Sequence, residues 1–456
     1  MPSYVNLYHE SPMRRLVTIL ALAAVLSPPD AHTQQPAAAP APGLVVILAA
    51  RLIDGTGAPP ISDAVVIISG NTITAVGTSS AVNIPVGAQV IDLGDATLLP
   101  GFIDAHVHLI GRTLGDPRRD NAIVRDYGSL SAILGVPNAQ ATLMAGFTSV
   151  RNVGAPDFQD MALRQAITEG RVPGPRMQNA GESLGITGGH CDENGFRPGL
   201  LDRDPDRFIA NGADAVRAAV RYEIKYGADV IKTCATGGVL SEGDAVGETQ
   251  YNLDELQAMV AEANKLGRKV AAHVHGTEGI KLAAQAGVSS IEHGSFMDEE
   301  GAKLMASKGT YLVATLMAGE AVERFARNGV LTGLRAQKAL AAAAAMWNAI
   351  KLARANRVMV ALGTDAGVIP HGTNAHEFIL LNQWGGYTPM EAIVAGTSNA
   401  AKLLGWEKNV GTLTAGKWAD IVAVPGDPLR DLTALERVTF VMKDGKVHKS
   451  AGRPST

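Results

Sequence analysis

Apolar and polar positions alternate along the middle of the chain in two regular patterns. Short runs rich in β-branched residues recur between residues 100 and 404, and amphipathic segments ending in glycine separate several of them. The runs predict strands and the amphipathic segments predict helices. The predicted strands are residues 101–109, 148–154, 176–184, 228–236, 269–276, 289–295, 310–316 and 358–365. Eight strands alternating with helices favour a parallel (β/α)8 TIM-like barrel of the α/β class over an open sheet.

The two flanks of this region have a different pattern, with short β-branched runs separated by turn residues and few helical segments. Such runs occupy residues 44–99 and return at residues 405–456. Several short strands at this spacing predict antiparallel sheet. Neither flank is long enough to form a stable domain alone, so we expect the two to pair. The sequence therefore predicts a small accessory β-sandwich domain formed from both chain ends, beside a barrel over residues 100–404.

The N-terminal residues have the pattern of a targeting segment. Arg14 and Arg15 precede an apolar run of eleven residues, 16–26, which is followed by small residues and prolines. The run is too short to cross a bilayer, which needs about 20 residues. We therefore interpret residues 1–33 as a signal peptide and leader, with a disordered leader as the alternative, and residues 34–43 as a linker. The start is either Met1 or Met13, and the mature protein is expected to be exported, periplasmic or secreted, without a permanent membrane span.

Composition narrows the classes of partner and of chemistry. Lys and Arg total 40 against 44 Asp and Glu, a net charge of -4, so no basic excess is available for nucleic acid. The two cysteines, Cys191 and Cys234, exclude a disulfide framework and a zinc ribbon. A thiol nucleophile would leave the histidines described next without a role. We expect Cys234 to fill space.

Histidines are concentrated at the ends of the predicted strands. His106 and His108 end the first strand two positions apart, so both side chains lie on one face. Neighbouring imidazoles are costly unless they share a metal, which points to a bound divalent cation. An ordinary polar strand end is the alternative for this pair taken alone. Matching groups end other strands, namely His273 and His275 on the fifth, His293 on the sixth and Asp365 on the eighth.

Lys232 is the exception among these strand ends, because it lies within an apolar run of the fourth strand. A buried ammonium there would be expensive and would repel the proposed cations. A neutral amine can instead react with carbon dioxide to give an anionic carbamate, whose two oxygens can bridge two metals. The alternative is an ammonium that reaches solvent or pairs with Asp365.

These residues together resemble the amidohydrolase superfamily. The resemblance also covers RLIDGTG from Arg51, LLPGFIDAHVHL and GKWADIVAV around Lys417. It is strongest to the branch with a carboxylated lysine, which contains Xaa-Pro dipeptidases and ochratoxin-hydrolysing amidohydrolases. The resemblance implies two divalent metal ions, of which zinc suits the mixed ligands and manganese or cobalt are alternatives. The implied ligands are His106, His108 and Asp365 for one ion, His273 and His293 for the other, and Lys232, carboxylated by carbon dioxide, as the bridge.

The resemblance also implies a reaction. It is hydrolysis of the amide between an acyl group and a C-terminal amino acid, in a small N-acyl amino acid or dipeptide, with Asp365 orienting the attacking hydroxide and accepting its proton. The favoured substrate is ochratoxin A, giving ochratoxin alpha and phenylalanine, and the enzyme is expected to be a homo-oligomer. A cyclic-amide hydrolase or a deaminase is the alternative, although mononuclear deaminases lack the lysine. A scaffold without activity is a third hypothesis, which the complete ligand set disfavours.

Three further residues are candidates for contact with the substrate. His275 could donate a hydrogen bond to the carbonyl oxygen as charge develops, or serve as a core histidine. His190 lies in a glycine-rich loop after the third strand, where barrel loops contact substrates or satisfy their own structure. Arg151, on the second strand, could receive a carboxylate or form an ion pair inside the barrel. We expect His371 and His376 to cap a helix or lie at the rim.

Overall fold

The computed structural model describes residues 43–202 and 208–450. The predicted signal peptide and leader, and the linker up to residue 42, lie outside these residues. Among the helices that the structure describes, none is long and apolar enough to pass through a bilayer.

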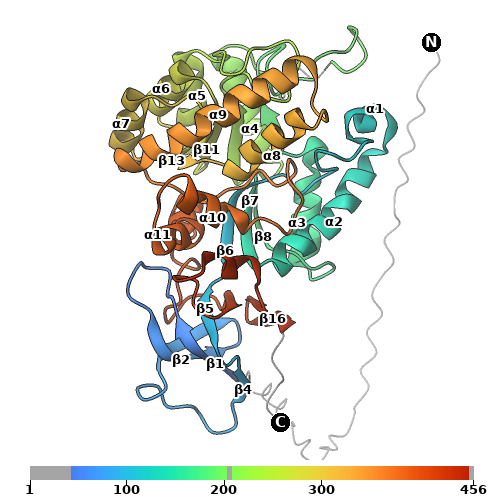
Figure 1. Cartoon of the computed structure of the whole chain (residues 1–456). Coiled ribbons are helices and arrows are strands. Elements are labelled where there is room, and N and C mark those ends of the chain that lie inside the picture. Colours follow the sequence, from blue (N-terminus) through green and yellow to red (C-terminus); the bar gives the residue numbers. More distant parts are fainter. Residues whose placement is uncertain (1–42, 203–207, 451–456) are drawn as a thin grey trace, which may run out of the picture. The chain divides into compact units, whose positions relative to one another are not determined.

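Parallel strands form the predicted barrel at the centre of the fold (Figure 1). One ladder joins β6, β7 and β8, and a second runs from β9 through β10, β11 and β12 to β13. Their bounds are β6 Phe102–Val107, β7 Phe147–Asn152, β8 Arg176–Asn179, β9 Ser183–Leu184, β10 Val230–Cys234, β11 Lys269–Val274, β12 Ser290–His293 and β13 Tyr311–Val313. The third predicted strand is thus broken into β8 and β9, and a hydrogen bond from Asp229 N to Asn179 O at 2.8 Å joins the two ladders.

The eighth predicted strand, residues 358–365, closes the ring through isolated contacts and not as a continuous strand. Leu312 of β13 bridges to Val360, and Val107 of β6 bridges to Ala366. The segment is irregular because it bends around β6, where both Thr364 N and Asp365 N donate to His106 O. Only glycine fits at Gly363, since a Cβ there would lie 2.9 Å from the His106 Cβ.

Helices surround the barrel strands, as the amphipathic segments predict (Figure 1). Helix α4 buries its apolar stripe, including Val216 and Val220. Helix α9 contains an alanine-rich run and packs along α8. The helices are α1 Ala122–Arg125, α2 Gly128–Met144, α3 Gln159–Thr168, α4 Ala213–Lys225, α5 Leu253–Lys265, α6 Thr277–Ala286, α7 Glu299–Lys308, α8 Leu316–Arg327, α9 Gly333–Ala355, α10 His376–Gln383, α11 Pro389–Val394 and α12 Ala400–Leu404.

The two flanks pair with each other, but in one sheet and not in a sandwich. The order of strands is β16-β15-β14-β5-β1-β2-β3, with β4 also paired to β1. Because β5 pairs with β1 on one side and β14 on the other, the ladder continues from the N-terminal to the C-terminal flank without a break. The strands are β1 Leu44–Leu52, β2 Ile61–Ser69, β3 Thr72–Thr78, β4 Gln89–Asp92, β5 Ala96–Pro100, β14 Ile421–Pro425, β15 Phe440–Lys443 and β16 Lys446–Ser450.

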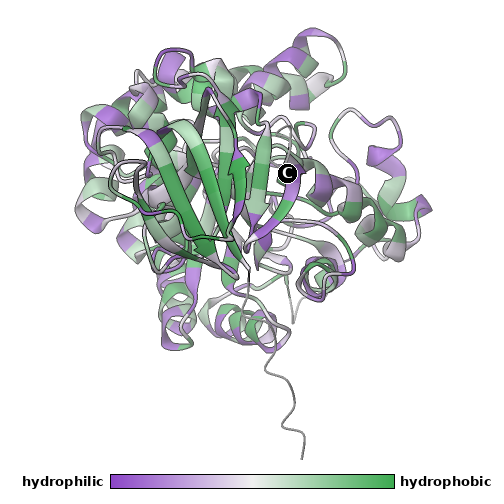
Figure 2. Ribbon diagram, turned by 90° about the horizontal axis from the view of Figure 1, so that it is seen from below, coloured by the Kyte–Doolittle hydropathy of each residue, from purple (hydrophilic) through white to green (hydrophobic). Residues whose placement is uncertain are grey.

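A hydrophobic cluster covers one face of this sheet, whose strands are largely green in Figure 2. It contains side chains from both flanks, such as Ile47, Leu98 and Phe440. The sheet leads directly into the barrel, since only Gly101 separates β5 from β6. It therefore lies at the end of the barrel where the strands begin, which leaves the opposite end free for the site.

Candidate active site

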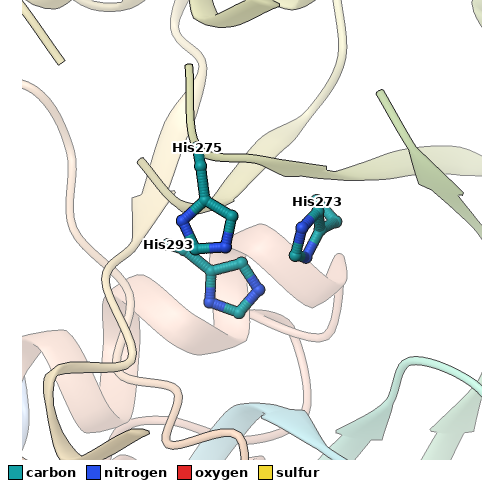
Figure 3. Close-up of side chains that lie close together, drawn as sticks. All are labelled: His273, His275 and His293. Atoms are coloured by element: carbon teal, nitrogen blue, oxygen red, sulfur yellow. The ribbon is translucent and has the colours of Figure 1, made fainter. Parts of the chain in front are cut away.

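Side chains from the carboxyl ends of the barrel strands meet in one cavity of about 1160 Å³. Two groups could each hold a metal ion, and within each group the ligand atoms lie within 4.8 Å of one another. The first contains His106, His108 and Asp365, and the second contains His273, His275 and His293, drawn in Figure 3. The rings of His106 and His293 are 5.1 Å apart, so the two groups adjoin. The six predicted ligands, which include Lys232, thus line the same cavity.

Asp365 faces the two histidines of its group. Its Oδ1 lies 3.6 Å from Nε2 of His106 and 3.5 Å from Nε2 of His108. The backbone of Asp365 has a φ of 58°, and that of His293 has 71°, both in the left-handed region that non-glycine residues rarely adopt. Such strain at two ligand positions is a feature of functional sites, because the surrounding structure must hold it.

Hydrogen bonds to Nδ1 fix the orientation of most of the rings. Each bond leaves Nε2 as the free ring nitrogen, which is how proteins orient histidine ligands. His106 Nδ1 is bound by Glu292 Oε2 at 2.8 Å, and His108 Nδ1 lies 3.3 Å from the carbonyl oxygen of Gly154. The partner of His275 is Ser295 and that of His293 is Thr315, each at 2.7 Å.

The protonation states of the histidine rings, and the hydrogen bonds that their nitrogens make or lack, are those expected of metal ligands. Burial lowers the pKa of His108 and of His275 to about 3, and lowers those of His106, His273 and His293 well below 6.5, with repulsion from Lys232 adding to each. The rings are therefore neutral, as metal ligands must be. In the described part of the chain, the buried Nε2 of His273 has no hydrogen-bond partner. An unsatisfied imidazole nitrogen beside two further rings matches the donor set that zinc prefers.

Lys232 is buried in the cavity wall, with 4% of its surface exposed. Burial lowers the pKa of its amine to about 8, against the opposing attraction of Glu292 and Asp365. Among residues 43–202 and 208–450, Nζ makes no hydrogen bond and has no carboxylate within ion-pair distance. The lysine thus neither reaches bulk solvent nor pairs with Asp365, which were the two alternatives to a modified amine.

Arg151 does not face the cavity, so its predicted role in binding a substrate carboxylate is wrong. The side chain lies inside the barrel with 1% of its surface exposed. It donates to Ala105 O at 2.6 Å, to Ser290 Oγ at 3.0 Å and to Glu292 Oε1 at 2.8 Å. The alternative, an internal ion pair, is the arrangement found. Glu292 was missed by the sequence analysis, although an acid beside His293 in a buried strand was a signal.

His190 lies in the cavity wall, where the sequence placed it. Its ring stacks on that of His273, with centroids 4.2 Å apart. Its Nδ1 lies 2.8 Å from Ser241 Oγ, which in turn donates to Asp244 at 2.6 Å. Lys338 of α9 pairs with the same aspartate at 2.9 Å. This support for His190 comes from residues that no sequence motif singles out.

The two cysteines form a disulfide, which corrects the expectation that Cys234 fills space. Cys191 and Cys234 are joined with their Cα atoms 5.8 Å apart. Cys234 ends β10 two residues after Lys232, and Cys191 follows His190. The bond therefore ties the glycine-rich loop to the strand that carries the lysine.

Two further histidines of the predicted set, His371 and His376, belong to neither group of ligands. His376 is the first residue of α10, and its Nδ1 bonds to Glu436 at 2.9 Å. His371 lies in sequence between Asp365 and α10 and is not among the residues that line the cavity, and in the described part of the chain neither of its buried ring nitrogens has a hydrogen-bond partner. His376 therefore lies at the start of a helix, whereas the place of His371 at the rim stays a prediction.

Comparison with known proteins connects this geometry to a family. The model of the amidohydrolase family matches residues 97–448. An ochratoxinase of Aspergillus niger is 34% identical over 437 residues, which cover 90% of this chain and 87% of that protein. A solved Xaa-Pro dipeptidase with methionine bound in its active site has a TM-score of 0.84 and 38% identity, covering 90% of this chain and 100% of that one. The solved A. niger ochratoxinase has a TM-score of 0.79 at 32% identity, covering 90% and 96%. The chain therefore belongs to the amidohydrolase family and is a hydrolase of amide or peptide bonds.

Proposed function

We propose that this protein is a binuclear metal-dependent amide hydrolase that releases a C-terminal amino acid from an acyl group. The observation that carries the proposal is the pair of adjoining ligand groups in one cavity with Lys232. The names of two similar proteins, an ochratoxinase and a Xaa-Pro dipeptidase, support a bond of this kind.

The residues divide into two sets of ligands. His106, His108 and Asp365 would hold one zinc ion, and His273 and His293 would hold the other. The carbamate of Lys232 would be shared between them, because carboxylation replaces an ammonium that would repel the cations with an anion that attracts them and has two oxygens. Two such cations lower the pKa of water and polarise a carbonyl group, so no serine or cysteine nucleophile is needed.

The protein side chains would move the protons. Asp365 would take the proton from the attacking water at a carboxylate oxygen and pass it to the leaving amine nitrogen, since it lies beside both histidines of its group. His275 would donate from Nε2 to the substrate's carbonyl oxygen, in the tautomer whose Nδ1 accepts a hydrogen bond from the Ser295 hydroxyl. His190 would contact the substrate from the loop above.

The favoured substrate is ochratoxin A, which gives ochratoxin alpha and phenylalanine. The cavity, at about 1160 Å³, is large enough for a ligand of drug size. Apolar side chains on one wall suit an aromatic group, among them Val322 of α8 and Met346 of α9.

Product analysis tests the reaction and the substrate separately. The zinc-loaded enzyme, supplied with bicarbonate and assayed for metal content, would be incubated with ochratoxin A and a panel of N-acyl amino acids and dipeptides. We expect phenylalanine and ochratoxin alpha in equal amounts. If amino acids are released from other compounds of the panel but not from ochratoxin A, the proposed substrate is refuted. If no compound releases an amino acid, the proposed activity is refuted.

Export and self-association complete the proposal. The apolar run after Arg14 and Arg15 supports export, and so does the Cys191–Cys234 disulfide, because such bonds persist in oxidising compartments. Fractionation of the native host should find processed protein outside the cytosol, whereas uncleaved cytosolic protein would contradict export. A homo-oligomer is expected from the family resemblance, and light scattering would measure it.

A further inference from the structure

Among the described residues, three arginines line the cavity, and one of these three forms no hydrogen bond or ion pair with another described residue. Arg112 donates to two aspartates at 2.8 Å each, and Arg335 pairs with Glu242 at 3.1 Å. Arg119 lines the same cavity, yet its guanidinium forms no hydrogen bond or ion pair with any residue that the structure describes. Among the arginines of the described lining, Arg119 is therefore the one whose guanidinium N–H groups donate to no described residue.

Burial makes this lack of a partner significant. Arg119 is half-buried, and desolvation lowers the pKa of its guanidinium. Asp120, Asp365 and Glu193 attract it without forming an ion pair, and Arg335 repels it. A guanidinium withdrawn from water without an anion forfeits the strong bonds that it makes to carboxylates. An anionic ligand would supply them.

The loop that carries Arg119 is fixed relative to the ligand groups. Leu114 N donates to Gly367 O at 2.7 Å, and Gly367 follows Asp365 by two residues. Arg119 N donates to Asp116 O at 2.9 Å, and the Asp116 carboxylate is one of the two held by Arg112. The guanidinium therefore projects from an anchored segment.

The rest of the lining disfavours an anion elsewhere. Among the described lining residues carboxylates outnumber cations, and those other than Asp365 are Asp120, Asp126, Asp157, Glu182, Asp192, Glu193, Asp202 and Glu242. Lys232 is reserved for the proposed metal bridge. A negative substrate group would be repelled at most positions and attracted at Arg119, which fixes its place.

We propose that Arg119 binds the free α-carboxylate of the amino acid that the enzyme releases. This inference rests on the proposed function and adds its specificity, a requirement for a C-terminal carboxylate. The planar fork of a guanidinium matches a carboxylate through two parallel hydrogen bonds. Arg119 thereby takes the role that the sequence analysis gave to Arg151, whose donors are all used inside the barrel.

A pair of matched substrates tests this specificity. N-benzoyl-L-phenylalanine and its C-terminal carboxamide would be compared with the zinc-loaded, full-length enzyme. Arg119→Met should lower kcat/KM for the acid by roughly 10- to 100-fold, mainly through KM, and leave that for the carboxamide unchanged. Arg119→Lys should recover part of the loss. Arg118→Met is the matched control, because its side chain is 73% exposed and lies outside the cavity lining.

A binding measurement separates this inference from the proposed function. N-benzyl-L-phenylalanine has an amine in place of the amide and cannot be hydrolysed, so calorimetry measures its affinity alone. Arg119→Met should weaken its binding by roughly 10- to 100-fold and Arg118→Met should not. If the wild type hydrolyses neither substrate, the function fails, and this binding still decides the role of Arg119. Equal activity on acid and carboxamide, or unchanged affinity in Arg119→Met, would overturn the inference.

Discussion

At the residue scale, the central question is whether Lys232 is a structural ammonium or a carboxylated metal ligand. Its amine is buried, makes no contact with a described carboxylate and has a pKa lowered to about 8 by burial. We predict that Lys232→Ala and Lys232→Arg both lose roughly 100-fold or more in kcat/KM. The reason is that loss of a residue that only supports a ligand already costs about 10- to 100-fold.

The contrast between the two variants identifies the chemistry. Acetate or propionate should partly restore Lys232→Ala, because a small carboxylate can occupy the space of the carbamate, and should not restore Lys232→Arg, where the guanidinium fills it. Zinc content is measured alongside the rate. Full activity in Lys232→Arg would show that a positive charge suffices and would remove the carbamate from the site.

Residue types at strand ends could be predicted from the sequence because a strand's period of two determines which side chains share a face. That rule placed His106 with His108, and the expectation that barrel strands carry their functional residues at one end brought Asp365 to them from the last strand. The same rule failed for Arg151. The period of a strand indicates which face a side chain lies on, but not whether it lies at the cavity or deeper inside the barrel. Arg151 is aimed at Glu292, an acid whose partners come from other strands and are invisible in a local pattern.

At the level of the elements, the glycine-rich loop after β9 depends on a covalent tie. The Cys191–Cys234 bond closes a separation of 43 residues between that loop and β10. The local sequence pattern indicates only the immediate neighbours of each cysteine, so it did not predict a pairing over this separation in sequence. The eighth strand shows the same limit, because its apolar run predicts a strand while contact with His106 bends it out of regular pairing.

We predict that the Cys191→Ser, Cys234→Ser double variant is less stable than the wild type. In the chain-entropy treatment, a closed loop of this size stabilises the folded state by about 4 kcal/mol. Chemical denaturation with and without reductant measures the difference. Reductant should destabilise the wild type and leave the double variant unchanged. If reductant does not change the stability of the wild type, and both of its cysteine thiols can be titrated without reductant, the bond does not form.

For the whole molecule, pairing of the two flanks could be inferred because neither has enough strands alone. Their arrangement as one sheet could not, since strand patterns give the alternation of faces but not the order of neighbours. The decisive pairing joins β5 to β14, with Leu98 opposite Ala423. Because β5 continues into β6, this sheet anchors the barrel at the end away from the proposed metal ligands.

That separation of the sheet from the site leads to a prediction about metal removal. The core clusters of the barrel and of the accessory sheet contain none of the proposed ligands, and burial keeps the ligand histidines neutral, so the apoprotein should remain folded. Binding of an ion to the folded state alone should add roughly 3–4 kcal/mol at 100 to 1,000 times its Kd. Calorimetric unfolding after chelation should show one cooperative transition at a lower midpoint, restored by zinc with bicarbonate. An apoprotein that unfolds on chelation would contradict the independence of the core from the site, and a midpoint that ignores zinc would contradict the placement of two ions in this cavity.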